Sequence, residues 1–306
     1  MNNYKITRED ALNLIEVPLN ELTNQANEIR QHFCQNRFDA CTIINVKSGK
    51  CSENCIFCAQ SKHHNTNIDI YPLISMDELK EKTLILYNFG LKRISYVSSG
   101  KTVNKTEFRK LSSLIKELTD EYEDIKICVS LGFLDEKQIM DLKNAGVHRI
   151  HNNLESSRSF FKEICTTHSY DDKLKTLKFI DENICSGGIF GLGETFADRI
   201  DLAIQLRDLG AKSIPINILN PISGTPVEDN SILSNDEVCR IVAIFRFVNP
   251  DAYIRLAGGR ALLEDNGKRA FQSGANAAIL GDMLTTEGLK LEDDLKLLKE
   301  LNYNII

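Results

Sequence analysis

The sequence predicts an α/β fold, namely a single (β/α)8 barrel of the TIM type with an N-terminal helical extension. Short segments rich in β-branched residues alternate with longer amphipathic segments, which is typical of parallel strands joined by helices. We expect eight segments of each kind along the chain. The length of 306 residues suits one such barrel as a single unit.

The first predicted element is helical. Apolar residues from Leu12 to Ile29 recur at spacings of three and four, which predicts helix over residues 8–36. No linker or low-complexity segment divides the chain, so we expect one domain. Its expected parts are a helical extension at 1–38, a barrel core at 39–283 and a C-terminal helix at 284–306.

Predicted strands and helices then alternate to the end of the chain. The strands are expected at residues 41–47, 93–98, 126–131, 149–154, 184–190, 213–219, 253–257 and 277–281. The helices are expected at residues 76–88, 105–119, 135–145, 171–182, 195–209, 235–248, 264–273 and 291–301. Active sites of such barrels lie at the carboxyl ends of the strands, so functional residues are expected there.

The composition excludes some classes of protein. With a net charge of −6 and no dense cluster of Lys and Arg, the chain is not expected to bind nucleic acid. No run of apolar residues is long enough to span a membrane, and the N-terminus lacks the apolar region of a secretory signal, so we expect a cytoplasmic protein. Nine cysteines in a reducing compartment favour metal or catalytic thiols over disulfides.

Three cysteines follow the first predicted strand. Cys51, Cys55 and Cys58 have the spacing C-x3-C-x2-C within one short loop. Three such thiolates can bind three irons of a cubane 4Fe–4S cluster and leave the fourth iron open for chemistry. The alternative is structural zinc, which normally takes four protein ligands. The chain has no second C-x2-C pair, so His63 or His64 would have to be the fourth ligand.

Further cysteines fall inside the predicted strands. Cys128 or Cys185 alone would be interpreted as a small buried hydrophobic residue. Arg255 also lies within a strand, and a buried arginine needs anions or acceptors around it. Cys41 opens the first strand. If these four side chains point inward, three thiols and one cation meet in the barrel lumen, which predicts a second cluster site.

Several longer motifs resemble those of a known family. They are KSGKCSENC at 47–55, NNLE at 152–155, CSGGI at 185–189, GLGET-x-x-DR at 191–199, PIN at 215–217, GTP at 224–226 and LTT at 284–286. Over nearly its whole length, the sequence resembles the biotin synthases, which belong to the radical S-adenosylmethionine (SAM) superfamily.

The resemblance implies a reaction and its cofactors. In this family a 4Fe–4S cluster reduces SAM to methionine and a 5′-deoxyadenosyl radical. The radical takes hydrogen from two saturated carbons of dethiobiotin, and an auxiliary cluster supplies the bridging sulfur. Unactivated C–H bonds offer no handle for acid–base catalysis, so cofactors must carry this chemistry. A ferredoxin or flavodoxin electron donor and a homodimer are also implied.

The resemblance implies five residues that contact SAM. Asn153 and Glu155 are expected at the ribose, because a carboxylate suits paired hydroxyl donors. Phe57 and Ile189 are expected beside the adenine. His168 stands where related enzymes carry an arginine, and it would donate one hydrogen bond to the methionine carboxylate.

Four residues are implied for the substrate. Asn153 and Asn217 are expected to bind the ureido ring of dethiobiotin, and Thr285 and Thr286 its carboxylate. The structural alternative for Asn153 and Asn217 is a buried amide that satisfies backbone groups.

The sequence departs from the family at the auxiliary cluster. Ser95 occupies the second-strand position that is commonly a cysteine ligand, and a hydroxyl is a poor ligand for iron. Cys41 occupies a first-strand position that is usually serine. Our hypothesis is that Cys41, Cys128 and Cys185, with Arg255, hold an auxiliary cluster that is 2Fe–2S, or 4Fe–4S with one open iron.

Two rival interpretations remain at this point. One is another radical SAM enzyme of this type, either a hydrogenase-cofactor maturase or a methylornithine synthase. The other is a non-catalytic iron–sulfur or zinc module. Cys128, Cys185 and Arg255 together favour sulfur insertion over the first rival. Release of 5′-deoxyadenosine from SAM in the presence of dithionite would distinguish an enzyme from the second.

Overall fold

The computed structural model describes residues 5–180, 183–281 and 288–306. Within these residues, eight strand positions close into a parallel barrel, because β9 pairs with β1. The strands are β1 (Arg37–Lys47), β2 (Arg93–Ser98), β3 (Lys126–Ser130), β4 (Arg149–His151), β5 (Ile184–Cys185), β6 (Gly188–Phe190), β7 (Ser213–Ile218), β8 (Tyr253–Leu256), β9 (Ala277–Ile279) and β10 (Asn304–Ile305). The predicted (β/α)8 fold is therefore confirmed.

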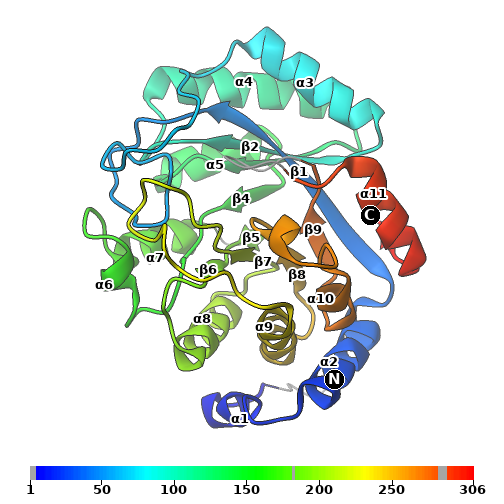
Figure 1. Cartoon of the computed structure of the whole chain (residues 1–306). Coiled ribbons are helices and arrows are strands. Elements are labelled where there is room, and N and C mark those ends of the chain that lie inside the picture. The colour runs from blue at the N-terminus through cyan, green and yellow to red at the C-terminus, as the bar shows by residue number, and fades with distance from the viewer. Residues whose placement is uncertain (1–4, 181–182, 282–287) are drawn as a thin grey trace.

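Helices surround the strands, as Figure 1 shows. They are α1 (Arg8–Asn13), α2 (Leu19–Cys34), α3 (Met76–Asn88), α4 (Lys105–Glu121), α5 (Glu136–Asn144), α6 (Phe161–Ile164), α7 (Tyr170–Phe179), α8 (Phe196–Asp208), α9 (Asn235–Val248), the 3-10 turn η1 (Arg260–Leu262), α10 (Lys268–Gln272) and α11 (Leu291–Glu300). Among the described residues, none of the helices has the length and apolar character needed to cross a membrane.

Local sequence fixes where many helices begin. Side-chain oxygens at the N-cap accept a backbone N–H of the first turn, which stabilises each helix by about 1 kcal/mol. These N-caps are Ser75 of α3, Asn104 of α4, Asp135 of α5, Ser169 of α7, Thr195 of α8 and Ser234 of α9.

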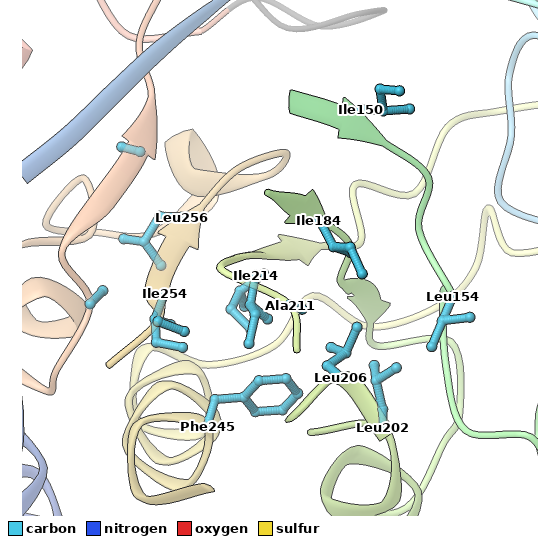
Figure 2. Close-up of a cluster of buried hydrophobic side chains, with 14 of the residues drawn as sticks. Ile150, Leu154, Ile184, Leu202, Leu206, Ala211, Ile214, Phe245, Ile254 and Leu256 are labelled. Atoms are coloured by element: carbon cyan, nitrogen blue, oxygen red, sulfur yellow. The ribbon is translucent and has the colours of Figure 1, made fainter. Parts of the chain in front are cut away.

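An apolar layer between strands and helices forms the core. Figure 2 shows part of it, contributed by Ile150, Ile184, Ile214, Ile254 and Leu256 on the strand side and by Leu202, Leu206 and Phe245 on α8 and α9. All of these side chains are buried. Packing of this kind holds each strand in place, so the side chains that point into the lumen have fixed positions.

The N-terminal segment differs from the prediction. One helix over residues 8–36 was expected, but α1 ends at Asn13 and α2 begins after Pro18. Proline restricts the residue before it to extended backbone and has no N–H to donate, so the helix cannot run through this point. α1 packs on α8 and α2 on α9.

Other elements also differ from the expected set. The strand predicted at 184–190 is split into β5 and β6, which both pair with β7. A Cβ at Gly187, between them, would overlap the carbonyl oxygen of Pro215, so the backbones approach more closely here than a side chain allows. Three short elements were not predicted: α6, η1 and β10, of which β10 pairs with the beginning of β1.

Candidate active site

The cysteine loop is folded against the carboxyl end of β1. The backbone turns at Gly49 and Lys50, which have φ of 75° and 57°. Gln60 then closes the loop: its side-chain oxygen accepts hydrogen bonds from the Ser48 hydroxyl (3.1 Å) and the Gly49 amide, and its carbonyl accepts the Cys51 amide at 2.9 Å. These bonds bring both ends of the triplet together.

The three loop thiols suit a metal cluster. Cys51, Cys55 and Cys58 are all half-buried. Burial raises the pKa of Cys51, and it raises that of Cys58 to about 11, so these thiols bind protons until a metal displaces them. Three soft ligands on one closed loop fit a cubane cluster with one iron left open.

A second thiol lies behind Cys55. One ligand atom each from Cys55, Cys165 and His168 lie within 4.8 Å of one another. The hydrogen bond from Cys55 lowers the pKa of Cys165 to about 3. His168 also contacts the carboxylate of Glu53, and Thr167 donates to the same carboxylate at 2.9 Å. His168, which directly precedes α7, therefore contacts the cysteine loop through Glu53.

An upper cavity of about 260 Å³ opens beside the cysteine loop. Its lining includes Cys58 together with Phe57, Asn153, Glu155, Ile189 and Asn217. The structure therefore brings five predicted site residues together next to one cluster thiol. His168 is not among the lining residues. Thr285 and Thr286 lie outside the described residues.

Asn153 and Glu155 follow β4 and are held by the segment between β5 and β6. The side-chain oxygen of Asn153 accepts the Gly187 amide at 2.9 Å, and its Nδ2 donates to Glu155 at 3.3 Å. Glu155 has a φ of 71°, which is rare for a residue with a side chain. Its amide donates to Gly187 (3.1 Å) and its carbonyl accepts from Ile189 (2.9 Å), so both neighbours fix this conformation.

Asn217 on β7 bridges β6 and the segment that follows β8. Its Nδ2 donates to the Gly188 carbonyl at 2.9 Å, and its oxygen accepts the Gly258 amide at 3.1 Å. The structural role that we considered for both asparagines is therefore present. Each amide still has a second N–H and a second lone pair, so the structural role leaves capacity for a ligand.

A lower cavity of about 210 Å³ lies in the barrel lumen. Its lining includes the predicted cluster residues Cys41, Cys128, Cys185 and Arg255. It also includes Ser95 on β2, the strand between those that carry Cys41 and Cys128. The same cavity shares Ile43, Asn217 and Ile279 with the upper one. The two cavities are therefore neighbours along the barrel axis.

Burial affects the three lumen thiols differently. It raises the pKa of Cys41 to about 12, and it also raises that of Cys128. At Cys185 burial acts in the same direction, but His151 and Arg255 outweigh it and lower the pKa to about 6. Cys185 is thus the lumen thiol that most readily becomes a thiolate.

The lumen also holds an ion network that the sequence analysis missed. Asp39 accepts from Arg93 Nε at 2.7 Å and Arg149 Nη1 at 2.6 Å, and Arg255 Nη2 lies 3.1 Å from it. Two of the missed residues, Asp39 and Arg93, lie two positions before a residue already considered on the same strand, Cys41 and Ser95 respectively. The period of two in strands would have identified them.

The donor set of the lower cavity fits an iron–sulfur cluster. Three thiols come from β1, β3 and β5, and three arginines outnumber the Asp39 carboxylate. Within the described chain, Arg149 Nε and Arg255 Nη2 have no hydrogen-bond partner. Buried, cationic and incompletely paired donors favour an anionic group here, and a thiolate-ligated cluster is anionic.

Comparison with known proteins identifies the family. Residues 45–206 match the model of the radical SAM superfamily, and residues 215–304 match the biotin and thiamin synthesis associated domain. A biotin synthase of Brachyspira hyodysenteriae is 52% identical, covering 100% of this chain and 92% of its own length. One of Akkermansia muciniphila is 48% identical, covering 98% of this chain and 94% of its own. This chain belongs to the biotin synthase family. It is therefore a radical SAM enzyme rather than a non-catalytic module.

Solved structures share the barrel of this biotin synthase family member at low sequence identity. Methylornithine synthase aligns with a TM-score of 0.85 and 18% identity, over 99% of this chain and 95% of that one. A maturase of the [FeFe]-hydrogenase aligns with a TM-score of 0.83 and 18% identity, over 98% and 72%. Such identities show the fold alone. The family assignment comes from the relatives that are 52% and 48% identical to this chain.

One motif of the biotin synthase family has a structural role here. The carboxylate of Glu194 accepts the backbone amides of Gly191 (3.0 Å) and Leu192 (2.8 Å), and Arg199 donates to it at 2.8 Å. Arg199 also reaches Glu237 on α9 at 2.7 Å. The motif at 191–199 therefore ties the turn after β6 to α8 and α9.

Proposed function

We propose that this protein inserts sulfur into dethiobiotin to form biotin, with SAM in the upper cavity and an auxiliary cluster in the lower one. One observation carries the proposal: two cavities with different chemistry share Ile43, Asn217 and Ile279. A substrate between them would reach a SAM site on one side and a sulfur-containing site on the other. Family membership supports dethiobiotin as the substrate.

Cys51, Cys55 and Cys58 would hold the 4Fe–4S cluster. When bound, the cluster supplies the electron that converts SAM into a carbon radical able to take hydrogen from a saturated carbon. The chain's own part is to hold SAM against the open iron. Cys58 lines the upper cavity, so a ligand there lies beside the cluster.

The residues around the upper cavity would orient SAM. Glu155 accepts the ribose hydroxyls, and Asn153 keeps its carboxylate in place through the 3.3 Å hydrogen bond. Phe57 and Ile189 provide apolar surface for the adenine and exclude water. His168 does not line this cavity, and its proposed hydrogen bond to the methionine carboxylate of SAM rests on the family resemblance alone.

Asn153 and Asn217 would recognise the ureido ring of dethiobiotin. Each amide already makes two hydrogen bonds within the protein and keeps one N–H and one lone pair for the ring, so the strand framework orients it before substrate binds. Thr285 and Thr286 would bind the carboxylate of the substrate, as the family resemblance implies.

Cys41, Cys128, Cys185 and Arg255 would hold the auxiliary cluster, either 2Fe–2S or 4Fe–4S with one open iron. Cys41 lies on β1, and its thiol replaces the ligand that Ser95 on β2 cannot supply. Arg255 is fixed by the carbonyls of Asp39 (3.0 Å) and Ala278 (2.8 Å), which supports a positioned cation at the cluster.

The resemblance also supports a ferredoxin or flavodoxin as electron donor, a homodimer and a cytoplasmic location. We also propose that residues 1–306 act as one domain, in which residues 39–283 form the barrel core.

Anaerobic turnover tests the proposed function. Protein reconstituted with iron and sulfide is incubated with dethiobiotin, SAM and dithionite, and biotin and 5′-deoxyadenosine are measured by mass spectrometry. Both products are expected from the wild type, and neither from Cys58→Ala. If 5′-deoxyadenosine forms freely and deuterium from labelled dethiobiotin never enters it, the substrate assignment is wrong.

A further inference from the structure

His151 occupies a position in the lumen that the proposed function does not use. It is the last residue of β4, between β3, which carries Cys128, and β5, which carries Cys185. His151 and Cys185 are direct partners in the strand register. The ring lines the lower cavity together with the three thiols and Arg255. A nitrogen donor thus lies among the proposed cluster ligands.

The imidazole is directed at one of these thiols. Its Nδ1 lies 3.3 Å from Sγ of Cys185, which is a normal separation for an N–H···S hydrogen bond. His148, which precedes β4, does not line the lower cavity and instead contacts Arg93 Nη1 at 2.9 Å. The two histidines at this strand therefore have different partners, although they are three residues apart in the chain.

A hydrogen bond to a cluster thiolate has a known physical effect. It withdraws electron density from the sulfur, favours the reduced cluster and so raises the reduction potential. It also fixes the side-chain orientation of the ligand. Ligation of iron by the same nitrogen would require Nδ1 to turn from the sulfur to the metal, whereas the observed contact is with the sulfur.

We propose that His151 is a positioning residue for the auxiliary cluster: it donates Nδ1–H to the sulfur of Cys185, orients that ligand and raises the potential of the cluster. This inference rests on the proposed function, because it requires an auxiliary cluster bound through Cys185. It adds a residue that the resemblance to the family did not identify.

The test removes the SAM cluster so that the auxiliary cluster is observed alone. In a Cys51→Ala/Cys55→Ala/Cys58→Ala parent, His151→Ala deletes the donor, and His151→Asn keeps an N–H close to the position of Nδ1. Iron and sulfide are counted, and the midpoint potential is measured by redox titration followed by EPR. Pulsed EPR then measures the nitrogen coupling of the reduced cluster.

We expect the parent to retain a cluster with a weak nitrogen coupling. His151→Ala should lose this coupling and shift the potential to more negative values, and His151→Asn should recover most of the shift. His148→Ala serves as the matched control and should shift the potential less than His151→Ala does. Loss of the cluster in His151→Ala alone, with parent-like behaviour in His151→Asn, also supports the proposal.

Other outcomes overturn the inference. An unchanged potential in His151→Ala, an equal shift in His148→Ala, or a strong nitrogen coupling that His151→Ala removes would each contradict the proposed hydrogen bond. Loss of the cluster in both His151 variants would indicate a ligand rather than a donor. A parent with no cluster at all would contradict the auxiliary cluster itself, and with it the proposed function.

Discussion

Substitution of Asp39 tests how much the buried ion network of the barrel lumen stabilises the fold. It is fully buried, and three guanidinium groups surround it, from Arg93 at 2.7 Å, Arg149 at 2.6 Å and Arg255 at 3.1 Å. Asp39→Asn keeps the shape of the side chain and removes its charge. Removing one partner of a buried ion pair costs about 3–5 kcal/mol. We predict a loss of this size in the free energy of unfolding of the cluster-free protein, measured by anaerobic urea denaturation at pH 7.

A surface ion pair of the same length provides the control. Asp201 lies 2.6 Å from Arg8, and both side chains are substantially exposed. Because solvent screens exposed pairs, Asp201→Asn should cost less than about 1 kcal/mol.

The pH dependence of the Asp39 effect gives a second check. Burial alone would raise the pKa of Asp39, but Arg255, Arg149 and Arg93 together lower it well below its ordinary value. A carboxylate with a lowered pKa stabilises the folded state above the pKa of the unfolded chain, and this contribution is lost as the pH falls. The difference between wild type and Asp39→Asn should therefore shrink below about pH 4. Equal stability at pH 7, or a difference that stays constant down to acid pH, would refute the reasoning.

Three further substitutions test other parts of the site. Gly187→Ala should destabilise the fold by about 1–3 kcal/mol in thermal or urea unfolding, because the new Cβ overlaps the Pro215 carbonyl; a neutral result would contradict the close approach. Glu155→Ala should raise the KM for SAM by about 10-fold or more, the size expected for a lost hydrogen bond to a charged group, and an unchanged KM would remove Glu155 from the ribose site. In the variant without the cysteine loop thiols, Cys41→Ala should abolish the remaining iron, whereas Cys239→Ala, which changes a buried thiol of α9, should retain it; iron retained in both would exclude Cys41 as a ligand.

Much of the fold could be predicted because local patterns determine it. Apolar residues at helical spacing predicted α3 and α9, and a β-branched segment predicted β2, each with the bounds that the structure has. The break before Pro18 was missed, although the chemistry of proline is local, because the apolar spacing continues across it. The split between β5 and β6 depends on the approach of Pro215, which no local pattern reveals.

The site residues also divide into those that a local pattern reveals and those that only the tertiary structure reveals. Cys51, Cys55 and Cys58 are recognised from their spacing, and the lumen thiols from their places in strands. Cys165 had no role in the sequence analysis, and the structure buries it beside Cys55. The sequence could not show this contact, because the two segments are far apart in the chain.

The roles predicted for Asn153 and Asn217 were derived from resemblance. Their hydrogen bonds to Gly187, Gly188 and Gly258 depend on tertiary structure, and they show that the same amides also hold the barrel strands together. The binding roles and the division at residues 38 and 283 stay predictions.

The source of the sulfur is the most direct test of the central claim, that the lower cavity holds the sulfur donor. Protein reconstituted with iron and ³⁴S-sulfide is given dethiobiotin, unlabelled SAM and reductant for a single turnover, and the mass of the biotin is measured. Our account predicts biotin that carries ³⁴S, and a Cys41→Ala variant that still cleaves SAM but forms no biotin. Unlabelled biotin, or normal biotin formation by Cys41→Ala, would contradict it.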